Sequence, residues 1–143
     1  MKVFIEQACE ARKKNIFDKT TKTLTETVDF HITYPYPYGY LLDTKAADGD
    51  ELDCYVITKT KLQTASIVEC DVIGMVEYVE DGMPDHKILV TLKGQRATVD
   101  DLVKQALLDF DANFFINQPK KETQVGDFLG AADALAAIKQ STV

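Results

Sequence analysis

The chain has 143 residues, of which 45% are hydrophobic and 27% are charged, and its formal net charge is −7. These proportions are typical of one folded domain and exclude an intrinsically disordered chain. The net charge and a pI of about 4.8 argue against a general binder of nucleic acid or of anionic membranes. We therefore expect a single domain over residues 1–143 whose partners include neither a nucleic acid nor a membrane.

The sequence carries no pattern of a targeting segment or of a zinc site. The N-terminus reaches Glu6 too early to contain the apolar core of a signal peptide, and no stretch is long and apolar enough to cross a bilayer. The cysteines, Cys9, Cys54 and Cys70, form no CxxC pair. We expect a cytoplasmic protein in which Cys54 and Cys70, which lie in apolar runs, are buried free thiols.

Strand patterns dominate the chain up to residue 92. Runs rich in β-branched and aromatic residues predict strands over residues 1–5, 15–18, 28–33, 54–58, 66–79 and 86–92. The Thr-rich residues 19–27 suit an edge hairpin. Gly74, inside the longest run, predicts a bulge or a sharp bend. Together these strands are expected to form a small closed sheet.

The rest of the chain predicts two helices. Thr98 is the predicted N-cap of the first, acidic residues follow in its first turn, and apolar residues recur at helical spacing as far as Phe114. A second helix is predicted over residues 127–139, with its apolar residues mostly on one face. The predicted fold class is therefore mainly β with α, a barrel covered by two C-terminal helices.

Three aspartates lie within six residues, at Asp48, Asp50 and Asp53, directly before a predicted strand. Acidic side chains repel one another, so placing them against an apolar strand requires a cation that neutralises them. Hard oxygen ligands that belong to no Cys/His cluster suit Mg²⁺ or Mn²⁺. The alternative interpretation is a solvated turn, because Asp-Gly is an ordinary turn dipeptide.

A second acidic segment contains Glu80, Asp81 and Asp85. If the strands on either side of it pair antiparallel, it can return to the end of the sheet that carries the first cluster. Five or six carboxylates would then converge, which predicts several Mg²⁺ ions with a phosphate-like anion between them. Lys87 could reach that anion. Taken alone, this segment is more simply interpreted as a solvated loop.

Four tyrosines alternate with Pro or Gly upstream of the first acidic cluster, at Tyr34, Tyr36, Tyr38 and Tyr40. The prolines exclude a helix and impose an extended path. Aromatic residues beside proline more often pack than bind ligands. At least two of these tyrosines are therefore expected in the core.

These residues resemble the soluble family I inorganic pyrophosphatases. Asp48-Gly-Asp-Glu-Leu-Asp53 matches the family's Asp-x-Asp signature, and Tyr34-Pro-x-x-Tyr38-Gly, at this distance upstream, looks like its Tyr-Pro segment. Asp85-His-Lys87 resembles the end of its acidic loop. The resemblance implies an OB-like five-stranded β-barrel flanked by two C-terminal helices. It also implies Mg²⁺-dependent hydrolysis of pyrophosphate to two phosphates by a homo-oligomer, with Mn²⁺ as a possible substitute.

The resemblance implies roles for individual residues as well. Its metal ligands would be Asp48, Asp53, Asp85, Glu80 and, further out, Glu6, with Asp81 as a competitor for the position of Glu80. Asp50 would be the general base near the attacking water. The phosphate oxygens would be held by Tyr38, Lys87 and Lys14.

The chain departs from the family pattern where the departing phosphate would be gripped. The family's Arg falls near Glu26, a metal-site Glu falls near Ile16, and its Tyr-Lys pair falls on residues 118–119, for which Lys120 or Lys121 could substitute. Two alternatives therefore stand beside a pyrophosphatase. One is a related Mg²⁺ phosphohydrolase for another phosphate compound, and the other is a non-catalytic metal- or phosphate-binding protein of the same fold.

Overall fold

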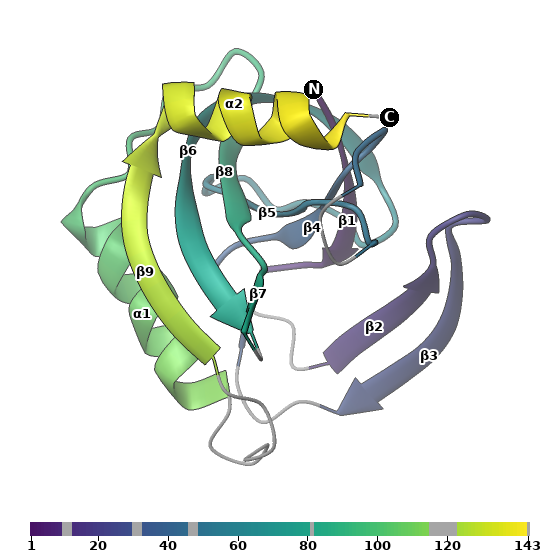
Figure 1. Cartoon of the computed structure of the whole chain (residues 1–143). Coiled ribbons are helices and arrows are strands. Elements are labelled where there is room, and N and C mark those ends of the chain that lie inside the picture. The colour runs from purple at the N-terminus through teal and green to yellow at the C-terminus, as the bar shows by residue number, and fades with distance from the viewer. Residues whose placement is uncertain (10–12, 30–32, 46–48, 81, 115–122, 143) are drawn as a thin grey trace.

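Figure 1 shows the computed structural model, which describes residues 1–9, 13–29, 33–45, 49–80, 82–114 and 123–142. In chain order the elements are β1 (Lys2–Gln7), β2 (Lys13–Asp18), β3 (Thr23–Asp29), β4 (Tyr38–Leu41), β5 (Asp53–Val56), β6 (Ile67–Glu80), β7 (Met83–Pro84), β8 (Lys87–Leu92), α1 (Asp101–Phe114), β9 (Thr123–Gly130) and α2 (Ala131–Ser141).

Five strands close into a barrel in the order β1-β4-β5-β8-β6, because β6 pairs again with β1. Neighbouring strands are antiparallel except β5 and β8, which run parallel. A closed sheet has no free edge along which another chain could add. The five-stranded barrel expected from the sequence is confirmed.

The long strand β6 links the barrel to a second group of elements. Its register against β8 shifts between Val72 and Gly74, which is the irregularity that Gly74 predicts. Beyond this point β6 pairs with β9, and a Cβ atom on Gly74 would lie 2.8 Å from the carbonyl oxygen of Leu129. A residue without a side chain is therefore needed where the two strands approach.

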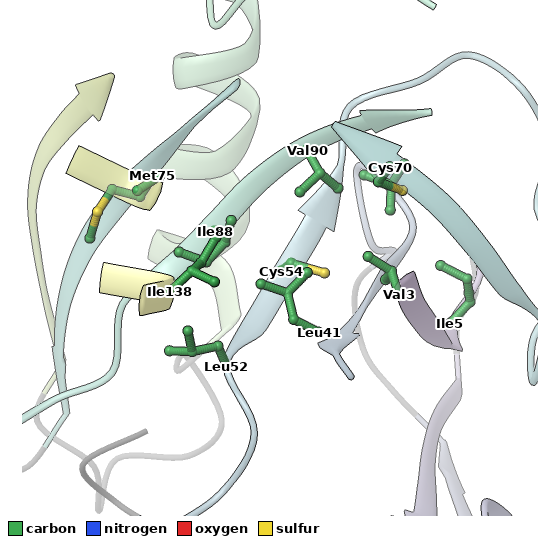
Figure 2. Packing of buried hydrophobic residues seen from close by; sticks show 12 residues of the cluster. Val3, Ile5, Leu41, Leu52, Cys54, Cys70, Met75, Ile88, Val90 and Ile138 are labelled. Atoms are coloured by element: carbon green, nitrogen blue, oxygen red, sulfur yellow. The ribbon is translucent and has the colours of Figure 1, made fainter. Parts of the chain in front are cut away.

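Alternate residues of the barrel strands point inward and form its core. Figure 2 shows this packing, in which Ile138 of α2 lies among side chains of the barrel strands. The inward-facing residues include Val3, Ile5, Leu41, Cys54, Val56, Cys70, Ile88 and Val90. The two thiols predicted to be buried are therefore in the core, and both are free.

The residues between the inward-facing ones lie on the outer surface of the barrel, which two elements cover in part. From one side, Phe110 of α1 packs 4.8 Å from Tyr34, measured between ring centroids. From the other, the hairpin β2–β3 brings Phe17 to within 5.1 Å of the Phe4 ring. In Figure 1, α1 and this hairpin lie on opposite sides of the barrel. The polar residues described below lie on the outer surface between them.

The starts of both helices differ from the prediction. The cap of α1 is Asp100 rather than Thr98, because Asp100 Oδ1 accepts a hydrogen bond of 3.0 Å from the backbone N–H of Val103. The second helix starts at Ala131 rather than at residue 127, since residues 127–130 continue β9 in its pairing with β6.

Two other expectations also concern the described part. Tyr34 and Tyr40 are buried, at 3% and 1% exposure, as expected for at least two of the four tyrosines. In the described residues no helix has the length and apolarity that a membrane crossing requires.

Candidate active site

The centre of the site forms where two parallel strands begin together. Cys54 of β5 lies opposite Ile88 of β8, so the preceding residues, Asp53 and Lys87, lie side by side. Lys87 Nζ is 2.7 Å from Asp53 Oδ2 and 2.9 Å from Asp85 Oδ2. The two acidic segments of the sequence therefore do converge at Asp53 and Asp85, and the ammonium group of Lys87 lies between these carboxylates.

Tyr38 completes the set of acceptors around Lys87. Its Oη accepts a third hydrogen bond from Lys87 Nζ, at 3.1 Å. The Tyr38 ring packs between those of Tyr34 and Tyr55, with centroids 5.6 and 5.0 Å away. Burial and the nearby charge of Asp53 raise the pKa of Tyr38 well above its usual value, so its phenol stays protonated and can donate a hydrogen bond.

The charge of Lys87 is stabilised by its partners. Burial alone would lower the pKa of Lys87, but the attraction of Asp53 and Asp85 outweighs it and raises the pKa above its ordinary value. An ammonium group has three N–H donors, and here they meet two carboxylates and one phenol. The requirement for a cation that the acidic pattern predicts is therefore met, in this structure, by a lysine.

Glu6 reaches the site because β1 bulges there. Ile5 pairs with Gly39 and Gln7 with Tyr38, so Glu6 is the extra residue between them. Its side chain is 9% exposed. Burial raises the pKa of Glu6 to about 7, although Lys19 acts to lower it. A carboxylate that is buried in this way is stabilised by a cation close to it.

The remaining predicted residues of the described part lie around this centre. Asp50 is exposed in the loop before β5 and acts electrostatically on Lys19. Lys14 lies on β2 opposite Val28 and acts on Glu6. The structure therefore gathers Glu6, Lys14, Tyr38, Asp50, Asp53, Asp85 and Lys87 in one region.

Several predicted residues cannot be placed. Asp48, Asp81, Lys120 and Lys121 lie outside the described residues, and of Glu80 only the backbone, at the end of β6, is described. Among the side chains that are described, no group of three or more His, Cys, Asp or Glu could hold a metal ion. In the region of the site, the described side chains that could bind a metal are carboxylates, and these carboxylates interact with lysine side chains.

The sequence patterns missed two charged residues of this region, Lys19 and Glu51. Lys19 Nζ lies 3.5 Å from Glu51 Oε2. The side chain of Lys19 is in the turn of the β2–β3 hairpin, and it reaches the site only because that hairpin folds back on the barrel. The sequence motif around Asp48 and Asp53 does not predict that the hairpin packs against the barrel.

The chain is similar to inorganic pyrophosphatases over almost its whole length. A family model described as inorganic pyrophosphatase matches residues 3–143. An inorganic pyrophosphatase of Synechocystis sp. is 34% identical over 143 residues, which cover 95% of this chain and 84% of that relative. One of Geobacillus stearothermophilus is 30% identical over 150 residues, which cover 98% of this chain and 90% of the relative.

Solved structures of inorganic pyrophosphatases have the same fold. The structure from Coxiella burnetii superposes with a TM-score of 0.88 at 22% identity, over 99% of this chain and 92% of that one. The structure from Thermus thermophilus gives a TM-score of 0.88 at 22% identity, over 99% and 88%. At this level of identity the likeness is one of fold.

Proposed function

Because the chain belongs to the inorganic pyrophosphatase family, we propose that it hydrolyses inorganic pyrophosphate to two phosphates with Mg²⁺ as its cofactor. The observation that carries the proposal is the convergence of Tyr38 on β4, Asp53 on β5, Lys87 on β8 and Asp85 just before β8. Neither a different phosphate substrate nor a non-catalytic binding role is favoured by the relatives.

The donor chemistry of the site supports Mg²⁺. Carboxylate oxygens are the side-chain ligands that Mg²⁺ prefers, and Mn²⁺ accepts the same donors. Asp53, Asp85 and Glu6 would hold the metal together with Asp48 and Glu80. When bound, Mg²⁺ lowers the pKa of a coordinated water and neutralises phosphate charge.

The side chains divide the remaining work between them. Asp50 accepts the proton of the water whose oxygen attacks one phosphorus atom, while the bridging P–O bond breaks and its electron pair leaves with the second phosphate. Lys87 and Tyr38 donate hydrogen bonds to phosphate oxygens. Because all three donors of Lys87 already have acceptors, Lys87 must exchange one of them for the substrate. Lys14 adds positive charge from β2.

The test is phosphate release from pyrophosphate with Mg²⁺, for the parent protein and for Asp50→Asn. Loss of a general base is expected to lower kcat by about 10² to 10⁴ with little change in KM. Asp71→Asn is the matched control, because Asp71 is an exposed aspartate on β6, and it should keep parental activity. EDTA should abolish turnover, and either Mg²⁺ or Mn²⁺ should restore it.

Other results would redirect the assignment. A parent that releases no phosphate from pyrophosphate but releases it from a nucleotide or a phosphate ester is a phosphohydrolase with another substrate. A parent that binds Mg²⁺ and turns over none of these compounds is a binding protein. Undiminished kcat in Asp50→Asn would remove Asp50 from the role of base.

The proposal extends to the setting of the enzyme. Residues 1–143 are proposed to form one catalytic domain, which the match of the family model to residues 3–143 supports. The protein is proposed to act in the cytoplasm and as a homo-oligomer. Chromatography with light scattering tests the oligomeric state, and a monomer at micromolar concentration would contradict it.

A further inference from the structure

The hairpin β2–β3 ends in a tight turn that fixes the position of Lys19. Asp18 Oδ1 accepts hydrogen bonds from the backbone N–H groups of Thr20 and Thr21, both at 2.9 Å. The carbonyl oxygen of Asp18 accepts another from the N–H of Lys22 at 2.6 Å. An aspartate that closes its own turn in this way holds the next residue in a defined place.

The turn is held against the barrel by aromatic packing. Phe17, one residue before the turn, is buried in a cluster with Phe4 and Tyr40. The side chain of Lys19 also lies against this cluster, because its Nζ is 5.4 Å from the centroid of the Tyr40 ring. The side chain of Lys19 is only 27% exposed. It is therefore directed at the barrel surface, where the site lies, and the ring stabilises its charge.

Lys19 faces the acidic side of the site. The carboxylates of Glu6, Asp53, Asp50 and Glu51 all act on it, and although burial opposes them they raise the pKa of Lys19. These residues come from β1, from the loop before β5 and from β5 itself. Lys19 is therefore a second charged ammonium group, besides Lys87, on which the carboxylate of Asp53 acts.

The contacts of Lys19 are looser than those of Lys87. Its ion pair with Glu51 measures 3.5 Å, whereas a charge-assisted hydrogen bond is about 2.7–2.9 Å long. In the described part of the chain, Glu51 is the carboxylate that lies within ion-pair distance of Lys19. Lys87, in contrast, makes three hydrogen bonds. Lys19 can therefore turn to an incoming anion at little cost.

We propose that Lys19 is a further substrate-binding residue, whose ammonium group donates hydrogen bonds to a phosphate group of the bound pyrophosphate. The inference rests on the proposed function. Its physical basis is charge, because a polyanionic substrate that approaches Glu6, Asp50 and Asp53 is repelled unless cations line the same surface. A lysine on a turn that packs on the barrel supplies such a cation.

The test measures substrate binding separately from turnover. Imidodiphosphate, an analogue with nitrogen in place of the bridging oxygen, is titrated calorimetrically at saturating Mg²⁺ into the parent, Lys19→Met, Lys19→Arg and Lys22→Met. Loss of one charge-assisted contact is expected to weaken binding about tenfold to hundredfold in Lys19→Met and to raise KM for pyrophosphate more than it lowers kcat. Lys19→Arg should recover most of the binding.

Lys22→Met is the matched control, because it removes the same charge from the same turn, and it should bind within about twofold of the parent. An effect of Lys22→Met equal to that of Lys19→Met would overturn the inference, since general charge would then explain both. Parental binding by Lys19→Met would overturn it as well. Thermal unfolding of each variant separates these outcomes from a loss of the fold.

A second comparison separates substrate binding from simple neutralisation of Glu51. If Lys19 only balances Glu51, the double variant Lys19→Met/Glu51→Gln should regain parental affinity, and the inference fails. If Lys19 binds phosphate, the double variant should stay as weak as Lys19→Met, whereas Glu51→Gln alone should bind as well as the parent or better.

The two proposals fail in different ways. A parent that binds imidodiphosphate without releasing phosphate from pyrophosphate contradicts the proposed function, and the binding series still decides the role of Lys19. A parent that does not bind the analogue overturns both.

Discussion

Lys87 bears on the stability of the site as well as on its proposed chemistry. It is 12% exposed and lies between two carboxylates that are 20% and 17% exposed. A charge this well buried is tolerated only when it is paired, and removal of one partner leaves the others uncompensated. Asp53 and Asp85 would then repel each other unless another cation takes the place of Lys87.

Replacement of Lys87 by methionine is expected to lower the free energy of unfolding by about 2–3 kcal/mol in EDTA. The loss should shrink when Mg²⁺ is added, because a metal at Asp53 and Asp85 pairs the same charges. Urea denaturation with and without Mg²⁺ measures both values. Lys93→Met, in the exposed turn that follows β8, is the control and should change stability by less than about 0.5 kcal/mol. Equal losses in EDTA and in Mg²⁺ would speak against carboxylates shared by lysine and metal.

Because of Asp111 on α1, the free energy of unfolding should depend on pH in a direction that can be stated in advance. Burial raises the pKa of Asp111 from 3.8 to about 6, so between these values the folded state binds more protons than the unfolded state. Stability is therefore lost as pH rises through this window. Asp111→Asn should stabilise the protein by about 1 kcal/mol at pH 7, after allowance for its partial exposure, and by nothing at pH 3.5.

Thermal or urea unfolding across this range of pH checks the expectation for Asp111. Asp109→Asn, which removes an acidic side chain from the exposed part of the same helix, is the comparison variant. A gain in Asp111→Asn that grows toward low pH would have the wrong sign.

At the scale of elements, the barrel depends on how closely β1 and β4 approach. Gly39 pairs with Ile5, and a Cβ atom at Gly39 would lie 1.8 Å from the carbonyl oxygen of Phe4. No side chain can move aside there, because the obstacle is backbone. The same pairing positions the bulge that carries Glu6, so the glycine serves both the barrel and the site.

Gly39→Ala is therefore expected to cost more than about 3 kcal/mol of unfolding free energy, as strain and displaced backbone do elsewhere. Gly130→Ala is the control, because nothing lies within 4 Å of a Cβ built there and its φ of −80° is ordinary. It should cost less than about 1 kcal/mol. Thermal unfolding of the two variants, followed by circular dichroism, measures both losses of stability. A loss in Gly39→Ala as small as that in Gly130→Ala would contradict the close approach of β1 and β4.

Local patterns predicted the elements better than their ends. Alternation and the apolar run around Gly74 were enough to predict β1, β5, β6, β8 and the bulge, whereas Pro35 and Pro37 predicted only an extended path into β4. The start of α2 was wrong because Phe128 and Leu129 suit a helix face as well as a strand. What makes them strand is their pairing with β6, and a single sequence does not contain that partner.

The site was predictable to a similar degree. The spacing of Asp53, Asp85 and Lys87 and the resemblance that they carry brought into one hypothesis residues that the structure places together, and family membership is confirmed. Lys19 was missed because its place depends on the contact of Phe17 with the barrel, between segments distant in sequence. The roles of the individual residues stay predictions.

At the scale of the molecule, the closed barrel divides the thiols into two classes. Cys54 and Cys70 are buried in the core, and Cys9 is exposed. Burial raises the pKa of both core thiols, that of Cys70 to about 11, so neither forms a thiolate near neutral pH.

A thiol reagent such as dithionitrobenzoate should therefore modify Cys9 rapidly in the native protein and reach the other two only on global opening. Modification of a Cys9→Ser variant should be slow in buffer and complete in guanidinium chloride. Rapid reaction of that variant without denaturant would show that the barrel opens locally.

The parallel pairing of β5 with β8 also sets the order in which the site can come into being. Asp53 and Lys87 are 34 residues apart in sequence, and the whole of β6 lies between them. Two parallel strands cannot be joined by a short hairpin, so this contact forms only after the chain has gone out along β6 and returned. Such non-local contacts are slow to form. A chain leaving the ribosome thus gains the proposed substrate-binding centre late, and during refolding the recovery of substrate binding is expected to report closure of the barrel itself.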